Sequence, residues 1–168
     1  MPILVLHLPA DNISNVKNEY SELRYKKLGD FARKNGIALA FENTGKCVEN
    51  FKYILNLIPD AKFCWDNAHQ SLFAGDEKFL PLFSDKLVAL HITDNNLCQD
   101  DHLIPFDGKI DFDVVAKTLA AIGYDGTIML ELLFRDSYAE TMSYKDYALK
   151  AKFAAERIIE MVKKYRNN

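Results

Sequence analysis

Five short apolar runs constrain the fold of this chain more than any other feature, because each run ends just before a residue that can bind a metal. The runs cover residues 3–6, 37–41, 61–65, 87–90 and 127–130, and the residues that follow them are His7, Glu42, Asp66, His91 and Glu131. Short apolar runs separated by helical patterns are typical of buried parallel strands in repeated β/α units. The sequence therefore predicts an α/β protein with about five parallel strands and outer helices.

The segments between these runs carry helix signals. We expect Asn12 or Ser14 to cap a helix that ends near residue 35, where Gly36 stops it. A second helix is expected at residues 48–57, and one or two short helices at residues 67–84.

Two further helices follow in the second half of the chain. Asp111 or Asp113 is expected to begin one that runs through Ile122 and closes at Gly123. Ser143, three residues before an aspartate, begins the last helix with a pattern like a capping box. Apolar residues then recur at spacings of three to four and predict one buried stripe: Tyr144, Ala148, Ala151, Ala155, Ile158, Val162 and Tyr165.

The length of 168 residues favours a single domain spanning residues 1–168. A closed β/α barrel needs eight strands, so five units would form an incomplete barrel with open edge strands. Either N-terminal strands are absent from this chain, or a second copy covers the edges as a homodimer.

Composition narrows the range of partners and compartments. Apolar residues make up 49% of the chain, and 21 basic against 24 acidic residues give a net charge of −3, which argues against a nucleic-acid surface. No signal peptide or membrane-length apolar stretch is visible. Because Cys47, Cys64 and Cys98 form no CxxC pair, we expect a reduced, cytoplasmic protein with no membrane contact.

Four of the strand-end residues form a candidate metal site. The carboxyl ends of parallel strands meet at one face of the fold, so Glu42, Asp66, His91 and Glu131 are expected to converge there. Three carboxylates and one imidazole suit Mn²⁺, Co²⁺ or Mg²⁺, with Zn²⁺ as a further candidate. The alternative for any one of these acids is a helix cap or a loop residue.

Two pairs of residues could assist such a site. The spacing of Asp66 and His69 lets one bind metal while the other contacts substrate, although Asp66 could equally cap a helix with His69 on its surface. Asp100 and His102 lie in the loop after His91 and have the spacing of a chelating pair, but polar loops also carry such residues by chance.

For the remaining candidates, a structural role in the core or in a turn is as plausible as a role in binding metal or substrate. His7 follows the first apolar run and could be a ligand, a substrate contact or a core histidine. Polar residues after two other runs could orient ligands, bind hydroxyls or form turns: Asn43, Thr44, Asp94 and Asn95.

In order and spacing, these motifs resemble the xylose-isomerase-like TIM-barrel superfamily, which includes sugar (phosphate) isomerases and epimerases and one class of apurinic/apyrimidinic endonucleases. The resemblance runs from residue 2 to residue 133 and matches the last five β/α units of that barrel. The motifs lie at residues 39–44, 64–69, 90–95, 100–112 and 130–131.

This resemblance implies roles for the candidates. Glu42, Asp66, His91 and Glu131 would be the shared metal ligands, with the two glutamates also acting as acid and base. His69 would touch a substrate oxygen. From the residues themselves, we also expect His7, Asn43, Asp100 and His102 to contact the substrate. In the endonucleases the counterparts of His69, Asp100 and His102 hold a further zinc, and His7 matches another ligand position.

The function implied is a divalent-metal-dependent sugar or sugar-phosphate isomerase or epimerase of carbohydrate metabolism, acting by proton transfer through an enediolate. A zinc-dependent endonuclease-like phosphodiesterase and a non-catalytic truncated barrel are the alternatives.

Overall fold

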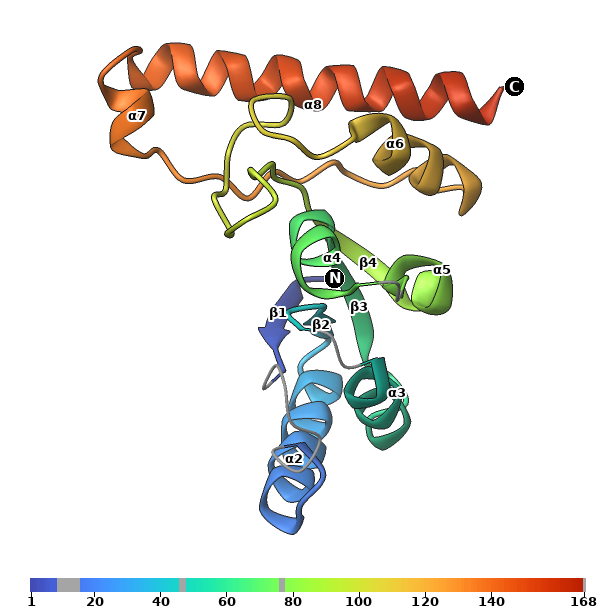
Figure 1. The fold of residues 1–168 in the computed structure, drawn as a ribbon. Helices are drawn as coiled ribbons and strands as arrows, with labels where there is room; N and C mark the ends of the chain where they lie inside the picture. Colours follow the sequence, from blue (N-terminus) through green and yellow to red (C-terminus); the bar gives the residue numbers. More distant parts are fainter. Residues whose placement is uncertain (9–15, 46–47, 76–77, 168) are drawn as a thin grey trace. The chain divides into compact units, whose positions relative to one another are not determined.

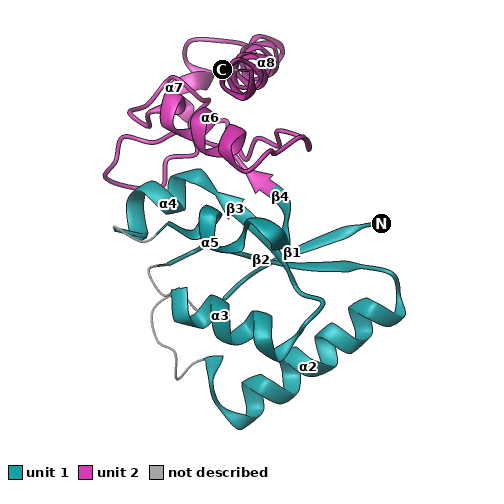
Figure 2. Cartoon of the chain, turned by 90° about the vertical axis from the view of Figure 1, so that its right-hand side faces the viewer, with its two compact units in different colours: residues 1–89 teal, residues 90–168 magenta. Residues whose placement is uncertain are grey.

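The computed structural model describes residues 1–8, 16–45, 48–75 and 78–167 (Figure 1). The chain divides into two compact units, Met1–Ala89 and Leu90–Asn168, which are coloured separately in Figure 2. The cap expected at Asn12 or Ser14 lies outside the described residues, as does Cys47. The expectation of one domain stays a prediction.

Four of the five expected strands are confirmed, each within one residue of its apolar run. They are β1 (Ile3–His7), β2 (Ala38–Glu42), β3 (Lys62–Asp66) and β4 (Leu87–His91), in the sheet order β1-β2-β3-β4. The β1–β2 and β2–β3 pairs are parallel. Each strand ends on the expected polar residue, so the apolar runs located the strands correctly.

Small side chains fill one face of the first unit's sheet. Ala40, Cys64 and Ala89 form a buried cluster, and Val5 and Val88 pack against it. Because residues two apart in a strand share a face, the next side chains on this face after Val5, Ala40 and Cys64 are His7, Glu42 and Asp66. The alternation of the strands therefore delivers these three polar residues to one face at one end of the sheet.

Helices of the first unit follow the strands in the expected order. They are α2 (Glu19–Lys34), α3 (Val48–Leu57), α4 (Asn67–Phe73), α5 (Phe79–Phe83) and the short 3₁₀ helix η1 (Ser84–Lys86). Helix α2 begins at Glu19, where the Asn18 side chain accepts a hydrogen bond from Ser21 N. Figure 2 shows α2 and α3 on the same side of the sheet. An aromatic cluster of Phe51, Phe63 and Phe83 joins α3, β3 and α5.

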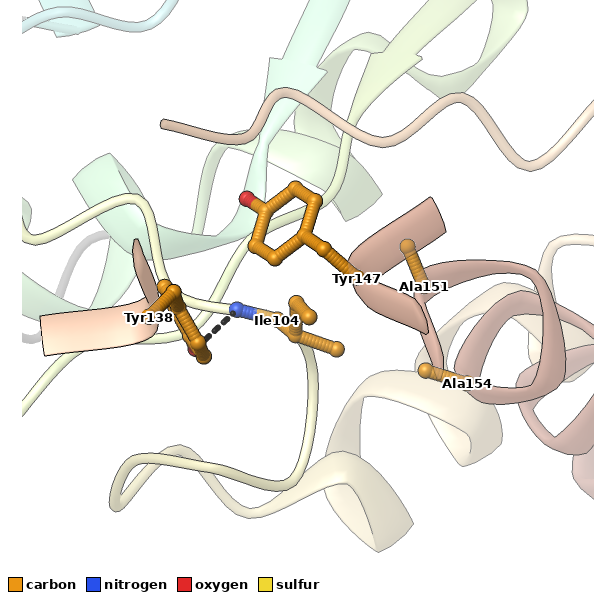
Figure 3. Close-up of a cluster of buried hydrophobic side chains, with 5 residues drawn as sticks. All are labelled: Ile104, Tyr138, Tyr147, Ala151 and Ala154. Atoms are coloured by element: carbon orange, nitrogen blue, oxygen red, sulfur yellow. Dashed lines mark hydrogen bonds between the residues drawn. The ribbon is translucent and has the colours of Figure 1, made fainter. Parts of the chain in front are cut away.

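The second unit is built on α6 (Phe112–Ala121), α7 (Asp136–Ala139) and α8 (Tyr144–Arg166), with α6 packed against α8. The expected caps Asp111 and Ser143 are both confirmed. Figure 3 shows part of its core, where Ile104 and Tyr138 meet the first turns of α8. None of the helices in the described ranges is long and apolar enough to cross a membrane.

The expected apolar stripe of α8 is wrong in its first half. The buried residues are Tyr147, Ala151, Ala154, Ile158 and Val162, whereas Tyr144 and Ala148 are exposed. Tyr147 packs edge-on against Tyr138 and Phe134, and this contact fixes which face of the helix turns inward. Alanines lie on both the expected and the observed face of this helix, so the spacing of apolar residues could not show which face is buried.

The expected fifth strand at residues 127–130 is reduced to a bridge between Leu130 and Ile92, with no longer ladder among the described residues. Ile92 N donates to Met129 O at 2.9 Å, and Glu131 N donates to Ile92 O at 3.1 Å. The ladder stops there because the chain beyond Ile92 pairs elsewhere, with Asp94 bridged to Leu103 in the antiparallel sense. The bridge still brings Glu131 to the end of this run.

Candidate functional site

Two fully buried carboxylates, Glu42 and Asp66, dominate the polar face of the first unit. Both residues are 0% exposed, and each offers a ligand atom within 4.8 Å of the other. Burying charged carboxylates costs free energy unless positive charge and hydrogen bonds compensate. Oxygen donors at this spacing fit a divalent cation, which supplies that compensation directly.

Two histidines contact the Glu42 carboxylate. His69 Nδ1 lies 2.9 Å from Oε1, and His7 Nε2 lies 3.3 Å from Oε2. The parallel register sets His7 directly opposite Glu42, while His69 comes from the first turn of α4. The side chain of His7 is 66% exposed and that of His69 only 9%, so this carboxylate lies between a solvent-facing and a buried imidazole.

Asn43 holds the main chain of Asp66. Its Nδ2 donates to Asp66 O at 2.8 Å, and its Oδ1 accepts from Asp66 N at 2.7 Å. Asp66 Oδ1 in turn accepts from His69 N at 2.6 Å and caps α4. Asp66 therefore caps the helix as the alternative interpretation expected, but His69 is buried and does not lie on the helix surface. The cap is compatible with ligation because it fixes the carboxylate in place.

The second unit pairs His91 with Glu131. His91 Nδ1 lies 3.2 Å from Glu131 Oε2, and the Glu131 side chain is 41% exposed. The bond from Glu131 N to Ile92 O sets the two residues side by side, because Ile92 directly follows His91. An imidazole and an accessible carboxylate thus meet at the end of β4.

The Asp100–His102 pair lies in the same unit. His102 Nε2 is 3.0 Å from Asp100 Oδ2, and its Nδ1 is 3.2 Å from Glu131 O. His102 has φ +50°, a left-handed conformation that is uncommon for a residue with a side chain. The loop therefore holds this pair against the main chain of Glu131.

Asp94 organises the loop that carries the pair. Its carboxylate is buried and accepts hydrogen bonds from four main-chain N–H groups, those of Asn95, Phe106, Gly108 and Ile110. The turn interpretation therefore fits Asp94 better than a contact with a substrate hydroxyl.

Four residues of the second unit were given no role by the sequence, namely Asp101, Asp107, Arg135 and Tyr138, although the first two lie within the motif at residues 100–112. The Gln99 amide, together with the main chain of Asn96, holds the pKa of Asp101 below its usual value. Tyr138 donates to Asp107 Oδ2 at 2.8 Å, and burial above all raises the pKa of Tyr138. The partners of Asp101 are local, but those of Arg135 and Tyr138 lie more than 30 positions away, and no local sequence pattern records such contacts.

Within each unit the structure brings the expected site residues together. His7, Glu42, Asn43, Asp66 and His69 gather in the first unit, and His91, Asp100, His102 and Glu131 gather in the second. That the two groups serve one cation stays a prediction.

Comparison with known proteins points to one family. The family model described as xylose isomerase-like TIM barrel matches residues 10–164. An uncharacterized protein of Sinorhizobium fredii is 38% identical over 100 residues, which cover 59% of this chain and 31% of that protein. An uncharacterized protein of Methanocaldococcus jannaschii is 26% identical over 147 residues, covering 77% of this chain and 48% of that protein.

Solved structures agree on the fold. A xylose isomerase domain protein from Planctomyces limnophilus superposes with a TM-score of 0.74 at 18% identity, over 99% of this chain and 62% of that one. A xylose isomerase-like TIM barrel/4-hydroxyphenylpyruvate dioxygenase fusion protein gives a TM-score of 0.72 at 14% identity, over 96% and 28%. The chain thus has the fold of a partial TIM barrel and spans less than half the length of both curated relatives.

Proposed function

The chain belongs to the xylose isomerase-like TIM barrel family, and we propose that it is a divalent-metal-dependent isomerase or epimerase of a sugar or sugar phosphate. The observation that carries the proposal is the pair of fully buried carboxylates, Glu42 and Asp66, flanked by the imidazole of His69. Such a pair is costly to bury without a cation. It lies at strand ends, where this kind of fold places its chemistry.

Four residues would hold the cation: Glu42, Asp66, His91 and Glu131. Their three carboxylates and one imidazole suit Mn²⁺, Co²⁺, Mg²⁺ or Zn²⁺. When bound, the cation would supply Lewis-acid stabilisation of the negative charge that develops on substrate oxygen as a carbon-bound proton leaves.

The protein's own residues would move that proton. Glu42 and Glu131 are the two carboxylates that can act as base and acid, one removing the proton and the other returning it. The two imidazoles on Glu42 fix the orientation of its carboxylate, and a fixed base is more effective than a mobile one. Asn43 would act by holding Asp66 in place.

Substrate oxygens would be bound by the histidines at the rim. His7 is largely exposed beside Glu42, while His102 and Asp100 lie beside Glu131. Imidazole and carboxylate groups bind sugar hydroxyls as donors and acceptors. The expected substrate is therefore a small polyhydroxylated molecule.

Elemental analysis of protein purified without chelator tests the cation. We expect one divalent ion per chain, lost in both Asp66→Asn and His91→Asn and retained in the exposed control Asp60→Asn. If no variant or reconstitution condition gives bound metal, the proposal is overturned and a non-catalytic truncated barrel becomes the better interpretation.

Solvent exchange tests the reaction itself. The metal-loaded protein is incubated in D₂O with a panel of aldoses, ketoses and their phosphates, and deuterium at carbon is followed by NMR. Metal-dependent incorporation at a carbon next to a carbonyl is expected. Metal binding without exchange on any panel member would keep the cation site and reject this substrate class.

One observation favours a second candidate, a zinc-dependent phosphodiesterase that acts at abasic DNA. Asp100 Oδ2 and His102 Nε2 lie 3.0 Å apart, a spacing at which both atoms could bind one metal ion. Nicking of an abasic duplex that EDTA abolishes would support this candidate, together with more than one zinc per chain. The acidic balance of the chain argues against it, and absence of DNA binding at low salt would remove it.

A further inference from the structure

Arg135 holds the main chain beside the Asp100–His102 pair. Its Nε donates to Asp101 O at 2.7 Å, and its Nη2 donates to Asp100 O at 3.2 Å. A guanidinium presents its donors in a rigid planar fork, so two successive carbonyls bound in this way lose their freedom to rotate. Arg135 is only four residues beyond Glu131, so the segment after this ligand candidate reaches back to the loop.

Tyr138, one turn further on, holds the other side of the pair. Its hydroxyl accepts a hydrogen bond from Ile104 N at 3.1 Å, drawn as a dashed line in Figure 3, and donates to Asp107 Oδ2 at 2.8 Å. Lys150 of α8 also reaches Asp107 Oδ2, at 2.7 Å. Arg135 caps α7 and Tyr138 lies within it, so this short helix contacts the loop both before and after His102.

His102 needs such support because its backbone is strained. Its φ of +50° costs free energy that the surrounding contacts must offset. Its carbonyl accepts from Leu133 N at 3.1 Å, and its ring Nδ1 lies 3.2 Å from Glu131 O. A residue held in a sparsely populated conformation by contacts on three sides points to a functional demand on its side chain.

We propose that Arg135 is a positioning residue: it fixes the Asp100 and Asp101 carbonyls so that the Asp100–His102 pair stays beside Glu131, with Tyr138 as the second anchor. The role of the pair as a substrate contact rests on the proposed function, but its positioning by Arg135 does not. Arg135 itself would not touch the substrate.

The first test needs no activity. The chain has four histidines, so the ring ¹⁵N signals of His102 can be assigned in the metal-free full chain with a single His102→Asn variant. In Arg135→Ala the His102 ring signals should shift while those of His7 and His69 stay in place. Arg166→Ala, which removes an exposed arginine of α8, should leave all four unchanged.

Two further variants keep the test decisive if Arg135→Ala folds poorly. Arg135→Lys keeps the charge but places its N–H donors on one nitrogen, whereas the guanidinium uses two, and Tyr138→Phe removes only the hydroxyl anchor. In both variants the ring ¹⁵N signals of His102 should shift while those of His7 and His69 stay in place. Unchanged His102 signals, or equal shifts of all four histidines, would overturn the positioning role.

A double-mutant cycle then tests the functional consequence in the metal-loaded enzyme. Losing a charged pair of hydrogen bonds should raise KM about tenfold in Arg135→Ala. If Arg135 acts through His102, the same substitution should have almost no effect on KM in a His102→Asn background. Additive effects would assign Arg135 to general stability and reject the inference. If no substrate is found, the proposed function fails while the ring-signal test still decides the positioning.

Discussion

At the scale of single residues, this fold places its least favourable groups where the chemistry is expected. Glu42 is fully buried with an imidazole against each of its carboxylate oxygens. A glutamate in the interior is rarely retained for stability alone, because an apolar residue of similar volume would cost less to bury. The charge of this side chain, more than its shape, is therefore the property to test.

Replacing Glu42 or Glu131 with glutamine keeps the volume and removes the charge. We expect turnover of an active substrate to fall at least about 100-fold in either variant, because a positioned acid or base contributes about that much. Steady-state assays measure it, with Glu49→Gln as the control, since Glu49 is exposed and pairs only with Lys52 among the residues described. Activity within threefold of wild type would remove these glutamates from the mechanism.

Asn43 gives a prediction about stability. Asn43→Ala removes both side-chain hydrogen bonds to the buried main chain of Asp66, which should lower the free energy of unfolding by about 2–4 kcal/mol. Urea denaturation measures the change. The exposed Asn56→Ala on α3 is the matched control and should change stability by less than about 0.5 kcal/mol. Equal losses in both variants would show that the two hydrogen bonds between the Asn43 side chain and the Asp66 main chain do not stabilise the fold.

At the scale of elements, the loop of residues 94–110 is fixed by close packing as well as by hydrogen bonds. A Cβ on Gly108 would lie 2.4 Å from Asp94 Oδ1 and 2.5 Å from Asn95 O. Gly108→Ala must therefore displace the buried carboxylate, and we expect a loss of about 1–3 kcal/mol. Gly75→Ala is the control: it meets open space but has φ +57°, so it should cost only about 1–2 kcal/mol of backbone strain.

The two glycine variants can be told apart by what else they change. Gly108→Ala should also shift the ring ¹⁵N signals of His102 in the metal-free protein, because the same loop carries that ring. Gly75→Ala should leave them in place. If both variants lose the same stability and neither moves His102, the loop is not held through Asp94.

The same loop predicts a dependence on acid. Hydrogen bonds from Gln99 and Asn96 hold the pKa of Asp101 below its usual value. The ionised Asp101 carboxylate therefore contributes its full stabilisation at pH values above its pKa in the unfolded chain, about 3.9. This stabilisation is lost as the pH falls through the lower pKa of the folded protein. Asp101→Asn should flatten the decline of unfolding free energy below about pH 4, as measured by urea titrations at several pH values. An unchanged slope would contradict this.

The sequence located elements well where the signal was local. The ends of β1 to β4 followed from apolar runs and their polar ends, and the start of α8 followed from Ser143 and its bond with Asp146. The reduced fifth strand could not be foreseen, because it depends on Asp94 pairing with Leu103 instead of extending the ladder. The clamp formed by Arg135 was missed for the same reason, since its partners lie more than 30 residues away.

At the scale of the whole molecule, the sheet leaves one edge strand uncovered among the described residues. β1 pairs with β2 on one side only, and Ile3 and Leu4 are 45% and 43% exposed. Residues 3–6 carry no charge that would discourage pairing. Uncovered apolar edges of this kind associate with other strands unless they are blocked.

We expect a second copy of the chain to cover this edge. In a symmetric dimer, β1 can pair antiparallel with β1 of the second copy, so the main-chain hydrogen-bonding groups of both β1 strands gain partners at once. Leu4→Lys places a charge on the edge and should convert a dimer into a monomer, measured by size-exclusion chromatography with light scattering. Leu149→Lys is the control, since Leu149 is 41% exposed on α8 and lies outside the edge. A wild-type monomer at high concentration, or equal dissociation by both lysines, would rule out pairing through β1.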